Sequence, residues 1–268
     1  MAVFFESGYS LPGGDEPLTH ARILHANNWL SGGTVSASTT GSEYFADAPA
    51  NSLTYEFWSP DTINAETWEY DHGSSAECDV CCIAAHNLFT AGSSVDVEYY
   101  NGSSWVTLVS ATPTDNSPIM AIFAPITAQR WRIAVQGVSV APVIGVIRFG
   151  KALQMPRPSA ASHKPLVYGR NVEMRTNESE TGEWLGRTIQ RKNLKTSYGW
   201  SIIEDTWFEA NWPATQQAFE AEPFFLAWRP GDDDSVGYCV VNESPAPSYS
   251  GRANYMGVTM NVTARAWE

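Results

Sequence analysis

Ser94-Val-Asp-Val-Glu-Tyr-Tyr100 alternates apolar and polar residues with a period of two, and Asn101-Gly102 follows it directly. A second strand-like run, Ser104-Trp-Val-Thr-Leu-Val109, comes next. Period two is typical of a strand with one buried face, and Asn-Gly favours a two-residue hairpin turn because both residues tolerate a positive φ. This stretch therefore predicts a β-hairpin, and it points to an antiparallel fold.

Further strand candidates recur between clusters of Gly, Ser, Asn, Asp and Pro. They are Thr54–Trp58, Cys78–Ala84, Ile119–Phe123, Arg130–Val135, Ile144–Gly150, Val167–Arg175, Glu183–Arg191, Leu194–Ile203, Phe224–Trp228, Val236–Val241 and Tyr255–Ala266. Short strands at this spacing favour an all-β fold over a parallel α/β sheet. One helix is expected near residues 206–222, with Asp205 or Thr206 as its N-cap. Pro213 falls inside this segment, so the helix starts or kinks there.

The composition changes at residues 153–166, which are rich in Pro and Ser and show no periodicity. Such a stretch is typical of a connection between domains. A chain of 268 residues is long enough for two domains that each bury a core. We therefore expect two β-sandwich-type domains, residues 1–152 and residues 167–268, joined by this linker, with the helix in the second.

The bulk composition limits the classes of function. Hydrophobic residues make up 43% and charged residues 17% of the chain, which argues against intrinsic disorder. A net charge of −13 argues against a general binder of nucleic-acid backbones, although a ring around DNA tolerates an acidic lumen. Residues 1–6 lack the features of a signal peptide, and no apolar run reaches membrane-spanning length. The expectation is a protein made in the cytosol.

Four cysteines are the obvious candidates for a metal or redox site. Cys78, Cys81 and Cys82, with the distant Cys239, could in principle hold zinc or an iron–sulfur cluster. However, Cys-x-x-Cys knuckles sit on tight turns, and residues 76–85 are apolar and strand-like. Cysteine also behaves as a small hydrophobic residue that favours burial. We therefore expect the interior of a strand, with no metal and no cofactor.

Histidines and carboxylates show no catalytic constellation. The five histidines lack metal-ligand spacing, and His86, at a strand end before Asn87, is expected to fix a loop by a hydrogen bond. Two carboxylates could form a glycosidase pair, but the sequence places none at the required separation. The candidates are Asp61, Glu66, Glu69 and Asp71, and then Asp232, Asp233 and Asp234, which suit a solvated turn or a weak Ca²⁺ site.

The chain holds eleven tryptophans, and four of them have two interpretations. They could form a platform on which a sugar ring stacks, or they could fill cores and subunit interfaces. Packing is the favoured interpretation, most clearly for the one that follows the Asn-Gly turn. The four residues are Trp29, Trp58, Trp68 and Trp105.

Two resemblances narrow these alternatives. Ile83-Ala-Ala-His-Asn-Leu88 leads into Gly92–Trp105, and Ala128-Gln-Arg-Trp-Arg-Ile-Ala-Val135 and Ile144-Gly-Val-Ile-Arg-Phe-Gly150 follow. Over residues 20–150 this series resembles the discoidin-like (coagulation factor 5/8 type C) sandwich. That resemblance implies a β-sandwich with a possible glycan site on its loops, near Asn27–Gly33 and Thr62–His72.

The second resemblance spans most of the chain. Gly150-Lys-Ala-Leu-Gln-Met-Pro-Arg-Pro158, Trp184-Leu-Gly-Arg-Thr-Ile-Gln-Arg-Lys192, Pro223-Phe-Phe-Leu-Ala-Trp-Arg-Pro230 and Val236-Gly-Tyr-Cys239 resemble segments of tail proteins of tailed phages. The resemblance implies a structural, non-enzymatic component of a siphophage-type tail tip, with a tail-tube-like C-terminal domain. It further implies a ring of copies, six by analogy, in the virion.

Three hypotheses result, and they differ in their partners. A distal tail ring protein would bind itself, the tail tube protein and tail-tip hub proteins, and DNA would pass through its lumen. A carbohydrate-binding module would bind a host glycan and catalyse nothing. An enzyme acting on the cell envelope would need a catalytic constellation, for which the sequence offers no support.

Overall fold

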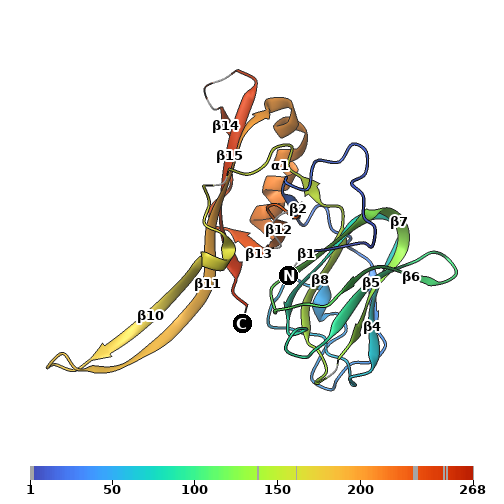
Figure 1. Cartoon of the computed structure of the whole chain (residues 1–268), viewed down its shortest axis with the longest axis horizontal. Helices are drawn as coiled ribbons and strands as arrows, with labels where there is room; N and C mark the ends of the chain where they lie inside the picture. The colour runs from blue at the N-terminus through green and yellow to red at the C-terminus, as the bar shows by residue number, and fades with distance from the viewer. Residues whose placement is uncertain are drawn as a thin grey trace.

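The computed structural model describes residues 3–137, 139–160, 162–231, 235–249, 251 and 253–267 (Figure 1). Half of the molecule is one seven-stranded sheet, and the other half is an eight-stranded sheet with one long helix. The predicted all-β class with a single α-helix is thus confirmed. The strands of the first sheet are β1 (Val3–Phe5), β3 (Thr34–Ala37), β4 (Ala65–His86), β5 (Ser94–Tyr100), β6 (Trp105–Ala111), β7 (Ile119–Gln136) and β8 (Ile144–Gly150).

Two long strands, β4 and β7, fold the first sheet into a sandwich. The N-terminal part of β4 pairs with β3 and with residues 130–136 of β7. Its C-terminal part pairs with residues 119–128 of β7 and with β8. Register shifts lie between these parts, where β-bulges bend strands. Across the enclosed core, the Trp131 ring lies 5.9 Å from the ring of Phe149 and 6.1 Å from that of Phe123.

The predicted hairpin forms β5 and β6, but its loop has four residues, 101–104, instead of the expected two, and Gly102 has φ +97°. Asn101 Oδ1 accepts hydrogen bonds from the backbone N–H groups of Ser103 and Ser104, both at 2.9 Å. The side chain of Asn101 therefore closes the turn. Val95 and Val97 point into the sandwich core, as period two predicts.

The second sheet has the strand order β10-β11-β15-β13-β12-β2-β9, and β14 pairs with β15. Figure 1 shows β10 and the first part of β11 as a two-stranded ribbon that extends away from the rest of the molecule. The strands of the second sheet are β2 (Arg22–Leu24), β9 (Leu153–Gln154), β10 (Arg170–Glu178), β11 (Trp184–Glu204), β12 (Phe224–Ala227), β13 (Val236–Val241), β14 (Ser248–Tyr249) and β15 (Tyr255–Arg265). Two short 3₁₀ turns, η1 (Ala48–Ala50) and η2 (Leu166–Tyr168), lie outside the sheets.

The helix α1 (Asp205–Ala221) covers one face of the second sheet and agrees with the predicted segment to within a residue at each end. It runs through Pro213 and begins before it, and its N-cap is Glu204, which makes no side-chain capping bond. Phe208, Trp212 and Phe219 pack from the helix onto the sheet. No helix in the described part of the chain is both long and apolar enough to cross a membrane.

The opposite face of this sheet packs against the sandwich. A shared core joins Phe225, Ala227 and Tyr238 of the second sheet to Val80 and Cys82 of β4. Residues 78–86 are consequently buried without interruption, whereas residues 65–71 alternate between buried and less buried positions. A strand loses its alternating pattern when both of its faces are covered, so residues 78–86 of β4 lie in the middle of three layers of sheet.

Some predicted segments differ from the observed ones. Thr54–Trp58 is not a strand: only Trp58 pairs, in an isolated bridge with Ile144. β2 and β9 belong to the second sheet, and Met155, in the predicted linker, is fully buried in its core. One strand from residues 1–152 and one from the predicted linker thus join the second sheet. The division at residues 153–166 stays a prediction.

The shared core gives a direct test of how strongly the two halves depend on each other. Phe225 is fully buried, and Phe→Ala at such a site costs about 3–5 kcal/mol. We expect Phe225→Ala to lower the free energy of unfolding by this amount in a guanidinium titration followed by tryptophan fluorescence. Phe89→Ala, at a side chain that is 49% exposed, is the control. A cost below about 1 kcal/mol for Phe225→Ala would contradict a tight junction.

Candidate functional site

A cavity of about 400 Å³ lies beside β8, next to the junction of the two halves. Its wall combines aromatic side chains with one cation, one carboxylate and several backbone groups. None of the lining residues is His or Cys. The lining residues are Trp29, Leu30, Ser31, Gly32, Gly33, Val35, Ala50, Asn51, Ser52, Trp68, Tyr70, Ile147, Arg148, Phe149 and Glu222.

The loop that carries Trp29 is held against the edge of β8 by backbone pairing. Leu30 N–H donates to the Phe149 carbonyl at 2.7 Å, and Lys151 N–H donates to the Asn28 carbonyl at 3.0 Å. Gly150 permits this approach, because a Cβ there would lie 2.2 Å from the Asn28 oxygen. The side chain of Trp29 is thereby fixed, half-buried, at the cavity.

The same loop closes over Tyr70 of β4. Gly33 N–H donates to the Tyr70 hydroxyl at 3.0 Å, and a Cβ on Gly33 would lie 2.3 Å from the Asp71 carbonyl oxygen. Burial raises the pKa of Tyr70, with the Gly33 hydrogen bond acting in the opposite direction. The cavity therefore unites the two segments in which the sequence predicts a glycan site, because its lining includes Trp29–Gly33, Trp68 and Tyr70.

Arg148 is the cation of the cavity, and it is only 6% exposed. Its Nη1 donates to the Pro49 carbonyl at 3.0 Å, and its Nη2 donates to Ser52 Oγ at 3.2 Å. The guanidinium carbon lies 4.5 Å from the centre of the Trp29 ring. Burial lowers the pKa of Arg148, and no carboxylate in the described part of the chain lies within ion-pair distance of it. A buried guanidinium held only by neutral acceptors and a ring face is costly, and it suits a site that binds a polar ligand.

The wall at η1 connects the cavity to the second sheet. The Tyr238 hydroxyl donates to the Ser52 carbonyl at 2.9 Å, while Ser52 Oγ accepts from Arg148. Burial raises the pKa of Tyr238 to about 12, so it remains a donor at neutral pH. Glu222, at the C-cap of α1, is the single lining residue from the second half of the chain.

Trp68 and Tyr70 are 1% and 7% exposed, so the half-buried Trp29 is the most accessible of these three aromatic rings in the lining. The cavity thus combines this ring with donors and an acceptor.

The other two tryptophans of the predicted platform lie elsewhere. Trp58 is fully buried, and its Nε1 donates to the Thr39 carbonyl at 2.9 Å. Trp105 lies under two guanidiniums, with Arg132 4.2 Å and Arg130 5.3 Å from its ring centre. The ring of Trp105 is thus packed, as predicted, and does not extend the cavity.

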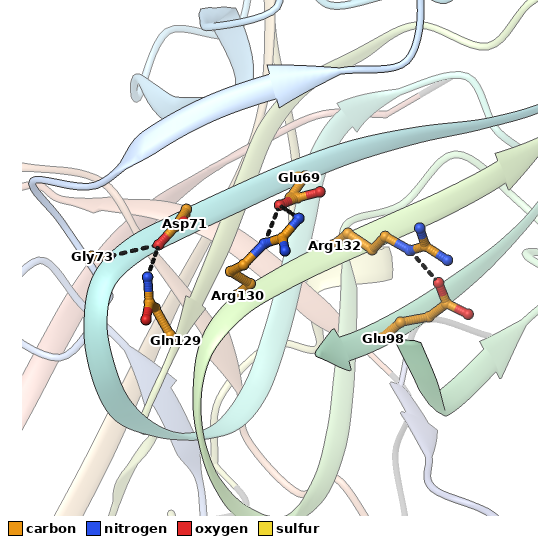
Figure 2. A network of polar contacts seen from close by, with 7 residues as sticks. All are labelled: Glu69, Asp71, Gly73, Glu98, Gln129, Arg130 and Arg132. Atoms are coloured by element: carbon orange, nitrogen blue, oxygen red, sulfur yellow. Dashed lines mark hydrogen bonds and ion pairs between the residues drawn. The ribbon is translucent and has the colours of Figure 1, made fainter. Parts of the chain in front are cut away.

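The candidate carboxylates near residue 66 bind structural partners. Glu66 is buried; burial alone would raise its pKa, but the hydroxyls of Ser38 and Thr62 that donate to it lower the pKa. Glu69 pairs with Arg130 at 2.5 Å, and Asp71 accepts a hydrogen bond from Gln129 at 2.9 Å; Figure 2 shows how these side chains face one another.

The same ladder of polar contacts extends across the sheet, where Glu98 pairs with Arg132 (Figure 2). These interactions link β4, β7 and β5 on the outer face of the sandwich. The remaining candidates, Asp232, Asp233 and Asp234, lie outside the described residues.

The cysteines lie inside strands, as the sequence indicates. Cys81 faces the sandwich core and Cys82 faces the shared core, and Cys239 lies in the core beneath α1. All four thiols, including that of Cys78, are free and buried, and burial raises their pKa values. The thiolate is the form that binds metals and reacts. Among the described residues no group of His, Cys, Asp and Glu could hold a metal ion.

His86 fixes the loop that follows β4, as its position at a strand end predicts. Its Nε2 lies 2.9 Å from the Ser117 carbonyl, and its Nδ1 lies 3.3 Å from the Leu88 nitrogen. These partners require a neutral ring with its proton on Nε2, because a carbonyl accepts and an N–H donates. Burial lowers the pKa of His86 to about 4.

Arg148 and Glu222 are not among the site residues that the sequence predicts. Arg148 lies within an otherwise apolar strand, Ile144–Gly150, in which every residue is buried. A charged residue inside such a run is a usable signal, because buried charge is rare without a structural or functional reason. Glu222 carries no comparable signal, since only the packing of the two halves brings it to the cavity.

No protein-family model and no curated protein matches the sequence. Solved structures similar to this chain include SpGH29, with a TM-score of 0.41 and 19% identity over 46% of this chain and 28% of that one. They also include chitosan-binding module 2 of a chitosanase/glucanase from Paenibacillus sp. IK-5, in complex with chitotriose. Its TM-score is 0.40, with 14% identity over 45% of this chain and 98% of that one. The family 32 module of C. perfringens NanJ in complex with galactose is a third, with a TM-score of 0.40 and 15% identity over 48% of this chain and 98% of that one. At these values the likeness carries no weight for function.

The neutral state of His86 predicts a pH dependence of stability. Its pKa is about 4 in the folded protein and 6.5 in a model peptide, so the unfolded chain takes up a proton first as the pH falls. Stability is therefore lost between pH 6.5 and pH 4. His86→Gln, which retains a donor for the Ser117 carbonyl, removes this contribution. We expect the stability gap between wild type and variant to narrow by about 2 kcal/mol between pH 7 and pH 5.

The measurement is a urea titration of both proteins at each pH. Asp79, whose pKa burial raises to about 6, acts in the opposite direction, and His25, whose pKa burial lowers to about 4, acts in the same one. Both groups are present in both proteins, so their effects cancel in the difference. A gap that does not change with pH would show that His86 is not held neutral.

Proposed function

We propose that this chain is a non-catalytic carbohydrate-binding protein, and that a saccharide occupies the cavity beside β8. One observation carries the proposal: a single cavity joins Trp29, Trp68 and Tyr70 to the buried Arg148 and the carboxylate of Glu222. Saccharides present apolar C–H faces and a rim of hydroxyl groups. Aromatic side chains next to a few fixed donors and acceptors match both features.

The positions of these groups are set before a ligand arrives. The loop at Trp29 is tied to β8, the Gly33 N–H to the Tyr70 hydroxyl, and Arg148 to η1 and Ser52. Preorganisation of this kind reduces the entropy that binding must offset. The proposal is non-catalytic because the cavity lining has no His or Cys that could serve as nucleophile or base, and only one carboxylate.

Trp29→Ala tests the proposal. Removal of the indole takes away a wall of the cavity and the ring that supports the Arg148 guanidinium, so we expect saccharide affinity to fall at least about tenfold. An array of neutral, acidic and amino saccharides identifies binders of the wild-type protein, and calorimetry with those sugars compares the variants.

Trp105→Ala is the matched control, because Trp105 is a half-buried tryptophan on the outer face of the sandwich and does not line the cavity. Its affinity for the same sugars should equal that of the wild type. Wild-type protein that binds no saccharide, or equal affinity in Trp29→Ala, would refute the proposal.

A second function, compatible with the first, is supported by the ribbon formed by β10 and β11. We propose that the chain is also a subunit of a phage tail tip, as the sequence resemblance implies. Residues 172–178 and 184–192 pair only with each other, and nearly all of them are exposed. A two-stranded hairpin is marginally stable alone in water, so a long one is expected to pack on another chain.

The ribbon also exposes apolar side chains. Trp184 and Leu185 are 64% and 67% exposed, and Met174 and Ile189, which face each other across the strands, are about half exposed. Such a surface suits a subunit interface. In this proposal the partners are further copies in a ring, six by analogy, with the tail tube protein and the tail-tip hub proteins. The chain would be made in the host cytoplasm and act in the virion.

Trp184→Ser combined with Leu185→Ser tests the assembly role. Without these apolar contacts, we expect the apparent dissociation constant of the oligomer to rise at least about tenfold. Native mass spectrometry and light scattering over a range of concentrations measure it. Tyr55→Ser, at a side chain that is 70% exposed and far from the ribbon in sequence, is the control. A wild-type protein that is monomeric at all concentrations and absent from purified virions would refute the assignment.

A further inference from the structure

We propose that Glu222 completes the saccharide site from the second half of the chain, and that a neutral sugar bridges Arg148 and Glu222 through two neighbouring hydroxyl groups. Binding would then tie the two halves together. This inference rests on the saccharide-binding function proposed above and adds the ligand class, a specificity-determining residue and a mechanical consequence.

The first argument is the chemistry of the two charged groups. Arg148 and Glu222 line the same cavity, and Glu222 acts electrostatically on Arg148, yet the two do not form an ion pair within 4.0 Å. Within the described chain, the carboxylate of Glu222 has no hydrogen-bond partner. Nη2 of Arg148 has two N–H groups and uses one, for Ser52 Oγ. A donor and an acceptor thus remain, separated by more than direct contact.

A pair of hydroxyl groups fits this arrangement. One hydroxyl oxygen accepts from the guanidinium, and the neighbouring hydroxyl donates to the carboxylate. Hydrogen bonds to charged groups are the strong ones, and each discriminates against ligands that lack the matching group. Because Arg148 and Glu222 line the same cavity, a uronate whose carboxylate pairs with Arg148 also lies near Glu222, and an amino sugar whose ammonium pairs with Glu222 also lies near Arg148. Like charges in one cavity are unfavourable, so the cavity selects neutral sugars.

The second argument is where the two groups are anchored. Arg148 belongs to β8 of the sandwich, whereas Glu222 is the C-cap of α1 and lies two residues before β12. The wall between them is already tied to both halves, because Ser52 accepts from Arg148 of the sandwich and from Tyr238 of the second sheet. Tyr238 packs on Phe225 with ring centres 4.8 Å apart, inside the shared core. A ligand that binds both Arg148 and Glu222 adds a second connection between the two halves, beside the one through Ser52.

The experiment uses two sugar series, galactose with galacturonate and galactosamine, and glucose with glucuronate and glucosamine. Calorimetry on the full chain compares wild type with Glu222→Ala and Glu222→Gln. We expect Glu222→Ala to weaken the neutral sugar at least tenfold. Glu222→Gln keeps a hydrogen-bonding group, so the neutral sugar should stay within about threefold while the uronate gains relative to it. Glu209→Ala, at an exposed position of the same helix, should change nothing.

Hydrogen exchange measures the mechanical consequence. In the wild-type protein the neutral sugar should slow exchange both in β8 and in residues 224–227 of β12. In Glu222→Ala, at saturating sugar, only β8 should respond. Exchange of Glu222→Ala is also measured in the absence of sugar. A structural role of Glu222 would change exchange there, whereas loss of the bridge changes it only when sugar is bound.

The outcomes distinguish the two levels of the proposal. Failure of every sugar to bind the wild-type protein would remove the saccharide function and this inference with it. Binding that depends on Trp29 but is unchanged in Glu222→Ala would leave the function standing and overturn the bridge. Preferred binding of a uronate or an amino sugar by the wild-type protein would also overturn it.

Discussion

The fold depends on the burial of one strand region on both of its faces. Residues 78–86 of β4 carry the sandwich core on one side and the shared core on the other. Sheet faces that pack in this way lose water from large apolar areas, which is the main favourable term in folding. Neighbouring residues of β4 are therefore both buried, and Cys81 and Cys82 pack into opposite cores.

This double burial also determines where a ligand can bind. β8 lies at the edge of the same layer, and every one of its residues is buried. A guanidinium at that edge, on Arg148, cannot reach water freely, so its environment is built from carbonyls, a hydroxyl and the Trp29 ring. The cavity is the place where the two halves meet around this cation. The junction that stabilises the fold therefore supplies the chemistry of the candidate site.

Two elements that depend on local sequence pattern, the β5–β6 hairpin and α1, could be predicted from the sequence. Period two and Asn101-Gly102 predict the β5–β6 hairpin, and the spacing of apolar residues predicts α1 to within a residue. Three-residue strands such as β2 carry no periodic signal, because they exist only through pairing with β12 and β9. For the same reason Glu222 could not be assigned to the site: its neighbours there are distant in sequence. Thr54–Trp58 has the composition of a strand, but only Trp58 forms a β-bridge.

The two proposed functions use different physical features, and this is why one chain can carry both. The ribbon exposes apolar side chains on two strands that have no third strand beside them. Such a surface is stabilised when another protein chain covers it. The cavity instead holds fixed polar groups beside ring faces, a surface that a small hydroxylated ligand satisfies better than a protein does. The cavity lining contains no ribbon residue. Because the sites share no residues, substitutions at Trp184 and at Trp29 should act independently, with additive effects on assembly and on binding.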